Sequence, residues 1–215
     1  MKLLSVNIGQ QETLETPNGP VKTGIIKKPV SGLVRITELG LEGDEIVDTK
    51  VHGGLDQAIY IYSQEDYDWW SERLGRKLSP GIFGENLTLS SFGDGPLNIG
   101  DRLEIGNLVI EISAPRTPCF KLATRMGDPG FIKEFVQASR TGAYARVIEN
   151  GEISGGDDVV LTKTTAGCPS VNEVFKTCHS KNPDMDIVRR SLQSPLGYFH
   201  KKIIQEIYDK RAINL

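Results

Sequence analysis

The chain has 215 residues, of which 38% are hydrophobic and 25% are charged, and its formal net charge is −3. This composition excludes wholesale disorder, and no apolar run approaches the ~18 residues that a membrane-spanning helix needs. Twenty-one of the 23 glycines lie before residue 166. The last 50 residues are therefore expected to be built differently from the first 165.

The balance of charged residues also changes near residue 165. Residues 1–165 carry 17 Lys and Arg against 23 Asp and Glu, whereas residues 166–215 carry 8 against 5. A tail this mildly basic predicts a solvated helical surface rather than an arm that binds nucleic acid. Two cationic segments interrupt the acidic part, residues 21–35 and 113–147, and they could mark a site for a small anion. The alternative is a scatter of surface charges.

Short β-type segments separated by turn residues fill the first 165 positions. The predicted strands are residues 3–8, 23–30, 32–39, 58–63, 85–90, 101–106, 108–114, 144–149 and 159–163. Gly106-Asn107 between two of them is typical of a hairpin turn. Only two helices are expected here, one between Ser63 and Gly75 and one that begins near Asp128. Many strands with few helices predict a closed or nearly closed β-barrel.

The period of the apolar pattern changes in the tail. Ser170 with Glu173 resembles a capping box at the start of a first helix, and a second helix is expected over residues 184–193. A third is expected near the C-terminus, with an apolar face of Phe199, Ile203 and Ile207. Such helices must pack on one another or on the strands, so we divide the chain into residues 1–165 and 166–215.

The three cysteines form an odd set without CxxC spacing, which predicts reduced thiols in a cytoplasmic protein. Cys119 has unusual neighbours. Pro115 and Pro118 stiffen the segment before it, and Arg116 and Lys121 are cations that favour a thiolate. A rigidly held thiolate suits a nucleophile or a ligand for a soft metal. The alternative is a small buried hydrophobic residue.

Two glycine-containing segments also interrupt the strand pattern. In LEGDEIVDTKVHGG, His52 stands directly before Gly53 and Gly54, whose backbone can approach a ligand closely. In PGIFGENLTL, Asn86 offers a side-chain amide just before a strand. The alternatives are a tight turn with a structural histidine and a plain connection from loop to strand.

These segments carry a resemblance to a known family. GLEGD, VHGG, FGENLT, IGDRLEIG and PRTPCFKLA follow the order and spacing of the MOSC family, named for the molybdenum-cofactor sulfurase C-terminal domain. The match runs from about residue 20 to residue 162. The tail resembles the three-helix domain of the YiiM-like subgroup. The resemblance implies a mainly β fold: a MOSC-type β-barrel with a few helices over residues 1–165, then a small three-helix bundle over residues 166–215.

The resemblance also implies a ligand, the molybdenum cofactor, which is a pterin with a dithiolene and a phosphate. A pyridoxal phosphate cofactor is not expected. Cys119 corresponds to the family cysteine that ligates molybdenum and is the implied catalytic residue. The expected phosphate-binding residues are Lys27, Arg116, Lys121 and Arg140. The residues expected to line the pterin are His52, Gly53, Gly54 and Asn86.

Similar proteins reduce N-hydroxylated substrates, such as hydroxylaminopurines and amidoximes, which implies a role in 6-hydroxylaminopurine detoxification. The sequence contains no GxGxxG motif and no iron–sulfur set of cysteines, so electrons are expected from a separate reductase. Nucleic acid and membrane partners are not expected, and an oligomer is possible. The alternatives are a non-redox carrier of the cofactor, a sulfur carrier with a persulfide on Cys119, and a tail that binds nucleic acid or protein.

Overall fold

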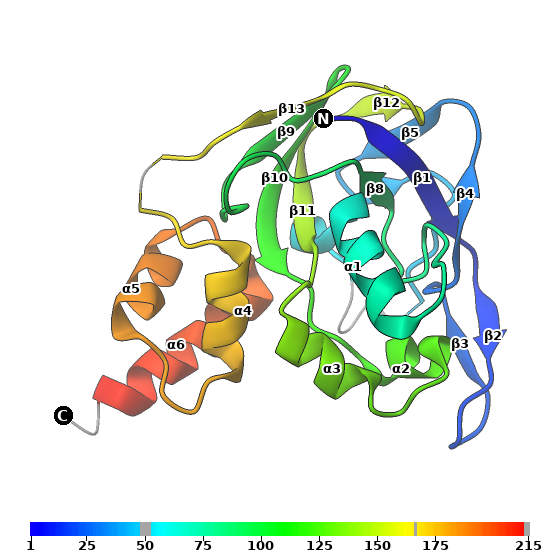
Figure 1. Ribbon diagram of the computed structural model, residues 1–215. Helices are drawn as coiled ribbons and strands as arrows, with labels where there is room; N and C mark the ends of the chain where they lie inside the picture. Colours follow the sequence, from blue (N-terminus) through cyan, green and yellow to red (C-terminus); the bar gives the residue numbers. More distant parts are fainter. Residues whose placement is uncertain (48–52, 166, 213–215) are drawn as a thin grey trace.

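A mixed sheet of eight strands forms the body of the protein, as the computed structural model shows (Figure 1). The structure describes residues 1–47, 53–165 and 167–212. The strand order is β13 (Val159–Thr162), β9 (Arg102–Ile105), β10 (Leu108–Pro115), β11 (Ala143–Glu149), β7 (Ile59–Ser63), β8 (Leu87–Leu89), β1 (Leu3–Gly9) and β4 (Lys27–Val30). Neighbouring strands are antiparallel except β7 and β8, which are parallel.

Two small sheets complete the strand structure. One contains β12 (Gly151–Ile153), β5 (Val34–Thr37) and β6 (Gly40–Leu41), and the other contains β2 (Glu12–Leu14) and β3 (Val21–Thr23). Each predicted strand segment coincides with an observed strand, although their ends differ by up to a few residues. The hairpin at Gly106-Asn107 is confirmed, because Ile105 pairs directly with Leu108.

The prediction was a closed or nearly closed barrel, and a fully closed barrel is not found in the described part of the chain. The edge strands of the eight-stranded sheet are β13 and β4. From Val6 to Gly9, one edge of β1 is already paired with β4. The start of the chain, from Met1 to Leu3, does reach the β13 segment, through an isolated bridge between Lys2 and Asp158 and backbone hydrogen bonds that include one from the Val159 amide to the Met1 carbonyl.

Three α-helices lie in the first part of the chain, where two were expected. The helix α1 (Gln64–Leu74) begins as predicted, with the Ser63 hydroxyl accepting from the Asp66 amide, and it ends at Gly75 with φ 61°. The helix α3 (Phe131–Ala138) begins slightly later than predicted. The helix α2 (Phe120–Met126) was missed, because its N-cap residue, Cys119, makes no capping hydrogen bond and the preceding prolines indicate a loop.

The tail contains the three expected helices: α4 (Val171–His179), α5 (Met185–Gln193) and α6 (Tyr198–Ala212). Figure 1 shows them together on one side of the sheet, beside β10. The apolar face predicted for α6 is partly wrong: Phe199 is 44% exposed, and the buried positions are His200 and Ile204. Ile204 belongs to the same hydrophobic cluster as the sheet interior. The division into two domains at residue 165 stays a prediction.

The capping box at α4 is confirmed. The Ser170 hydroxyl accepts from the Glu173 amide at 3.1 Å, and the Glu173 carboxylate accepts from the Ser170 amide at 2.7 Å. We expect Ser170→Ala to lower the free energy of unfolding by about 1 kcal/mol, because an amide of the first turn loses its partner. Chemical denaturation measures this change. Ser170→Thr keeps the capping oxygen, and an equal loss in both variants would contradict the explanation.

Across the described ranges, none of the helices is both long and apolar enough to traverse a bilayer.

Candidate functional site

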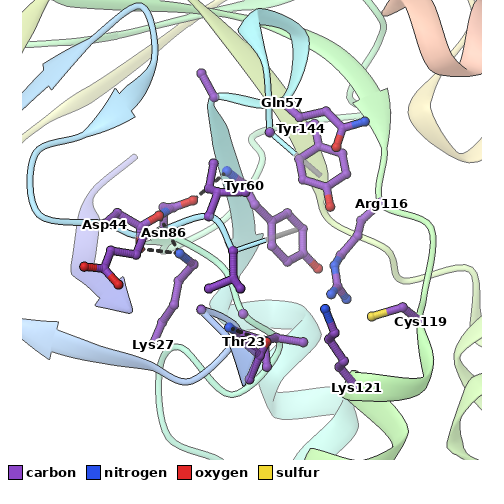
Figure 2. A pocket seen from close by; sticks show the side chains of 18 residues that line it. Thr23, Lys27, Asp44, Gln57, Tyr60, Asn86, Arg116, Cys119, Lys121 and Tyr144 are labelled. Carbon is purple, nitrogen blue, oxygen red and sulfur yellow. Dashed lines mark hydrogen bonds and ion pairs between the residues drawn. The ribbon is translucent and has the colours of Figure 1, made fainter. Parts of the chain in front are cut away.

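A cavity lies between β4, β7, β11 and the loop that follows β10 (Figure 2). Its lining includes Thr23, Ile25, Lys27, Asp44, Ile46, Gly53, Gln57, Tyr60, Gly84, Asn86, Arg116, Cys119, Lys121 and Tyr144. The chain therefore brings most of the predicted site residues into one cavity.

One wall of the cavity is a buried ion pair. The Lys27 Nζ lies 2.5 and 2.6 Å from the two carboxylate oxygens of Asp44. Asp44 also accepts from the Gly9 amide at 2.8 Å and from Asn86 Nδ2 at 2.9 Å. Burial lowers the pKa of Lys27, and the neighbouring Asp44 only partly offsets this effect. Lys27 thus lines the cavity as one half of an ion pair, and its predicted phosphate role stays a prediction.

The opposite wall carries a cation with an unused donor. Arg116 is 4% exposed, and its guanidinium lies 5.0 Å from the centre of the Tyr60 ring. Its Nη1 makes no hydrogen bond within the described structure. Burial disfavours the charge, but Tyr60, Tyr144 and Cys119 more than offset this, so the pKa of Arg116 is raised. Arg116 is therefore a charged, buried donor that lines a cavity, which is costly unless an anion or acceptor binds there.

Cys119 and Lys121 lie beside Arg116. In Figure 2 the Cys119 sulfur and the Lys121 ammonium both point toward the Arg116 guanidinium. Cys119 is half-buried, and Lys121, in the first turn of α2, is 9% exposed. Two cationic side chains and a thiol thus converge in one part of the cavity. This set of groups can bind an anion and offer sulfur to a soft metal.

The FGEN segment folds tightly enough to place Asn86 in the cavity. Gly84 has φ 82°, and a Cβ there would lie 2.8 Å from Ile25 Cγ1. The buried Glu85 accepts from the Gly81 amide at 2.6 Å and from the Tyr67 hydroxyl at 2.5 Å. Burial raises the pKa of Glu85. Asn86 is then fixed by the Tyr60 amide, which donates to its Oδ1 at 3.1 Å.

Two predicted site residues, Arg140 and Gly54, are not among the described residues that line this cavity. Arg140 does not line this cavity: it pairs with Asp66 at 2.5 Å, stacks 4.8 Å from the Trp69 ring centre and lines a different depression. Gly53 lines the cavity, whereas Gly54, with φ 76°, precedes the short 3₁₀ helix η1 (Leu55–Gln57) and is not among the lining residues. His52 lies outside the described residues.

The lining residues that sequence reasoning missed include Asp44, Gln57, Tyr60 and Tyr144. Asp44 belongs to the GLEGD motif, so it could have been found there. Tyr60 and Tyr144 face each other because β7 pairs with β11, and the sequence does not reveal this register. Gln57 supplies a second unused group, because its Oε1 is buried without a hydrogen-bond partner within the described structure.

The tail contacts the loop that carries Arg116 and Cys119 through His200. Its ring is 2% exposed, and Nε2 lies 3.2 Å from the Thr117 hydroxyl, two residues before Cys119. Burial, with a smaller contribution from His179, lowers the pKa of His200 to about 4. The ring is therefore neutral at the usual working pH.

The low pKa of His200 predicts a loss of stability in acid. The unfolded chain takes up this proton below a pKa of about 6.5, whereas the folded protein resists it down to about 4, so stability falls between these values. Between about pH 7.5 and about pH 5, we expect the wild type to lose about 2 kcal/mol more than His200→Gln. Denaturation curves at both pH values measure the difference. Equal losses in the two proteins would contradict the prediction.

The fold and the cavity together define a sheet-dominated protein with a buried arginine, a lysine and a thiol in one cavity. A model of the MOSC domain matches residues 48–160. YflK from Bacillus subtilis is 38% identical over 159 residues, 74% of this chain and 72% of that protein. The chain belongs to the MOSC family, whose domains are associated with the molybdenum cofactor.

Two further comparisons extend over most of the chain. The crystal structure of YiiM from Geobacillus stearothermophilus has a TM-score of 0.78 and 28% identity, and the match covers 95% of this chain and 97% of that one. A protein named "Reductase" from Gibberella moniliformis is 30% identical over 192 residues, 87% of this chain. The matched region is 34% of the fungal protein, so the chain spans about a third of that relative.

Proposed function

We propose that the cavity binds the molybdenum cofactor and that the loaded protein reduces N-hydroxylated compounds, such as hydroxylaminopurines and amidoximes. The observation that carries the proposal is Arg116, a buried cation whose Nη1 has no partner in the described structure, beside a thiol in one cavity. Family membership and the relative named "Reductase" support it.

The residues present fit this cofactor. Its phosphate and dithiolene are anionic, and Arg116 and Lys121 are the cations that would hold them by charge-assisted hydrogen bonds. The unused Oε1 of Gln57 is an acceptor, which suits the N–H groups of a pterin. The sulfur of Cys119 would be the protein's ligand to molybdenum.

When bound, the cofactor would supply a metal that accepts oxygen and passes two electrons to the substrate. The protein's part is to bind and orient. Tyr60 and Tyr144, which are 3% and 9% exposed, flank Arg116 and exclude water from its guanidinium. The buried pair of Lys27 and Asp44 holds Asn86 against the cavity wall. Electrons would come from a separate flavoprotein or iron–sulfur reductase.

Turnover tests the proposal. Protein made in a host that synthesises the cofactor should consume 6-hydroxylaminopurine or benzamidoxime with a reduced viologen dye as the electron donor. Protein from a host that lacks the cofactor is the matched control and should be inactive. Fully loaded protein without turnover would overturn the reductase proposal and favour a cofactor carrier. An extra sulfur on Cys119 without molybdenum would favour sulfur transfer.

A further inference from the structure

We propose that the tail is part of the site, and that His200 on α6 is a positioning residue that holds the Cys119 loop through Thr117. The importance of this contact for catalysis rests on the proposed function, whereas the contact itself does not. It would give the helical tail a role that extends beyond packing.

The loop between β10 and α2 turns its side chains to opposite sides. Arg116 and Cys119 line the cavity, whereas the hydroxyl of Thr117, between them, lies 3.2 Å from His200 Nε2. Thr117 is not among the lining residues. A constraint on Thr117 therefore acts on the backbone that carries both the buried cation and the thiol.

The hydrogen bond that the structure shows for the His200 side chain is to this loop. Its ring is 2% exposed, and Nδ1 has no hydrogen-bond partner within the described structure. The bond to Thr117 therefore provides the hydrogen bonding that the structure shows for this buried ring. Losing it would leave a second ring nitrogen unsatisfied, so the ring and the loop stabilise each other's positions.

The start of α6 is anchored firmly enough to transmit this constraint. The Gly197 amide donates to the Ser113 carbonyl of β10 at 2.8 Å, and the Tyr198 amide donates to Asp56 Oδ2 at 2.7 Å. Asp56 lies in η1, directly before Gln57 of the cavity wall, and pairs with Arg146 of β11 at 2.8 Å. The start of the helix is thus tied directly to β10 and η1, and through Asp56 to β11.

The loop itself leaves few other degrees of freedom. Pro115 and Pro118 each fix φ, so the remaining backbone freedom between them belongs to Arg116 and to Thr117, which is itself restricted because it precedes Pro118. The bond from Thr117 to His200 restrains that position from the tail side. Without it, the loop should open more often and expose the half-buried Cys119.

The accessibility of Cys119 tests the proposal on full-length protein that lacks the cofactor. Iodoacetamide labelling, quantified on the Cys119 peptide by mass spectrometry, should become about fivefold faster in His200→Phe and in Thr117→Val. Deuterium exchange of the peptide that spans the loop should rise similarly. His200→Gln and Thr117→Ser keep the polar partner and should stay close to the wild type. The double variant should be no faster than either single variant, because both remove the same bond.

Ile204→Val is the control, because it alters the buried face of α6 without touching the loop. It should leave labelling of Cys119 unchanged. Unchanged labelling in His200→Phe would overturn the proposal. So would additive effects in the double variant, or faster exchange throughout the chain, which would mean that His200 serves general stability alone. None of these results depends on molybdenum, so failure of the proposed function would be recognised separately.

Discussion

Replacing Cys119 with Ala is expected to lower kcat/KM for an N-hydroxylated substrate by at least about 100-fold. The proposed role of its sulfur is to ligate molybdenum, and no other cysteine lines the cavity in the described part of the chain. Cys119 is half-buried at the start of α2, and alanine is smaller and favours a helix, so the fold should tolerate the change. Turnover with an artificial electron donor measures the loss.

Two further variants make this result specific. Cys119→Ser keeps the size of the side chain but offers a harder oxygen ligand, so it should lose activity almost as fully. Cys168→Ala removes a thiol that is not among the lining residues and should leave activity unchanged. Wild-type turnover in Cys119→Ala at full cofactor loading would contradict the ligand role while leaving cofactor binding intact.

Replacing Arg116 with Met is expected to change binding and stability in opposite directions. The affinity for the cofactor should fall about 100-fold, because a buried charge-assisted hydrogen bond to an anion is lost. The protein without cofactor should become more stable by about 1 kcal/mol, because a buried cation with an unsatisfied donor, Nη1, is replaced by an apolar side chain of similar length. Stacking of the guanidinium on Tyr60 opposes this gain and limits it.

Molybdenum content and denaturation curves measure the two effects of Arg116→Met. Arg140→Met is the matched control, because Arg140 pairs with Asp66 outside the cavity. That variant should keep the molybdenum content of the wild type. A loss of cofactor in Arg140→Met, or unchanged cofactor retention in Arg116→Met, would contradict the assignment of the anion-binding residues.

The features that could be predicted from the sequence are local. Ser63 and Ser170 mark helix starts, and Gly106-Asn107 marks a hairpin, because each signal lies within a few residues of the structure it specifies. Arg116, Cys119 and Lys121 were grouped correctly in one cavity for the same reason, since they share one short segment.

The features that sequence reasoning missed depend on long-range contacts. The sequence assigns the same phosphate role to Lys27 and Arg140, yet Lys27 pairs with Asp44 within the cavity and Arg140 pairs with Asp66 outside it. Whether the sheet closes depends on which strand pairs with each edge of β1. The alternation of apolar residues shows which face of β1 is buried, but it does not show which strands are the neighbours of β1.

The molybdenum content of purified protein tests the central claim most directly. The wild type, made in a host that synthesises the cofactor, should contain molybdenum in an amount stoichiometric with the chain. Cys119→Ala, prepared in parallel, should lose most of it. Wild-type protein that contains no molybdenum would contradict the claim that this cavity is a molybdenum-cofactor site.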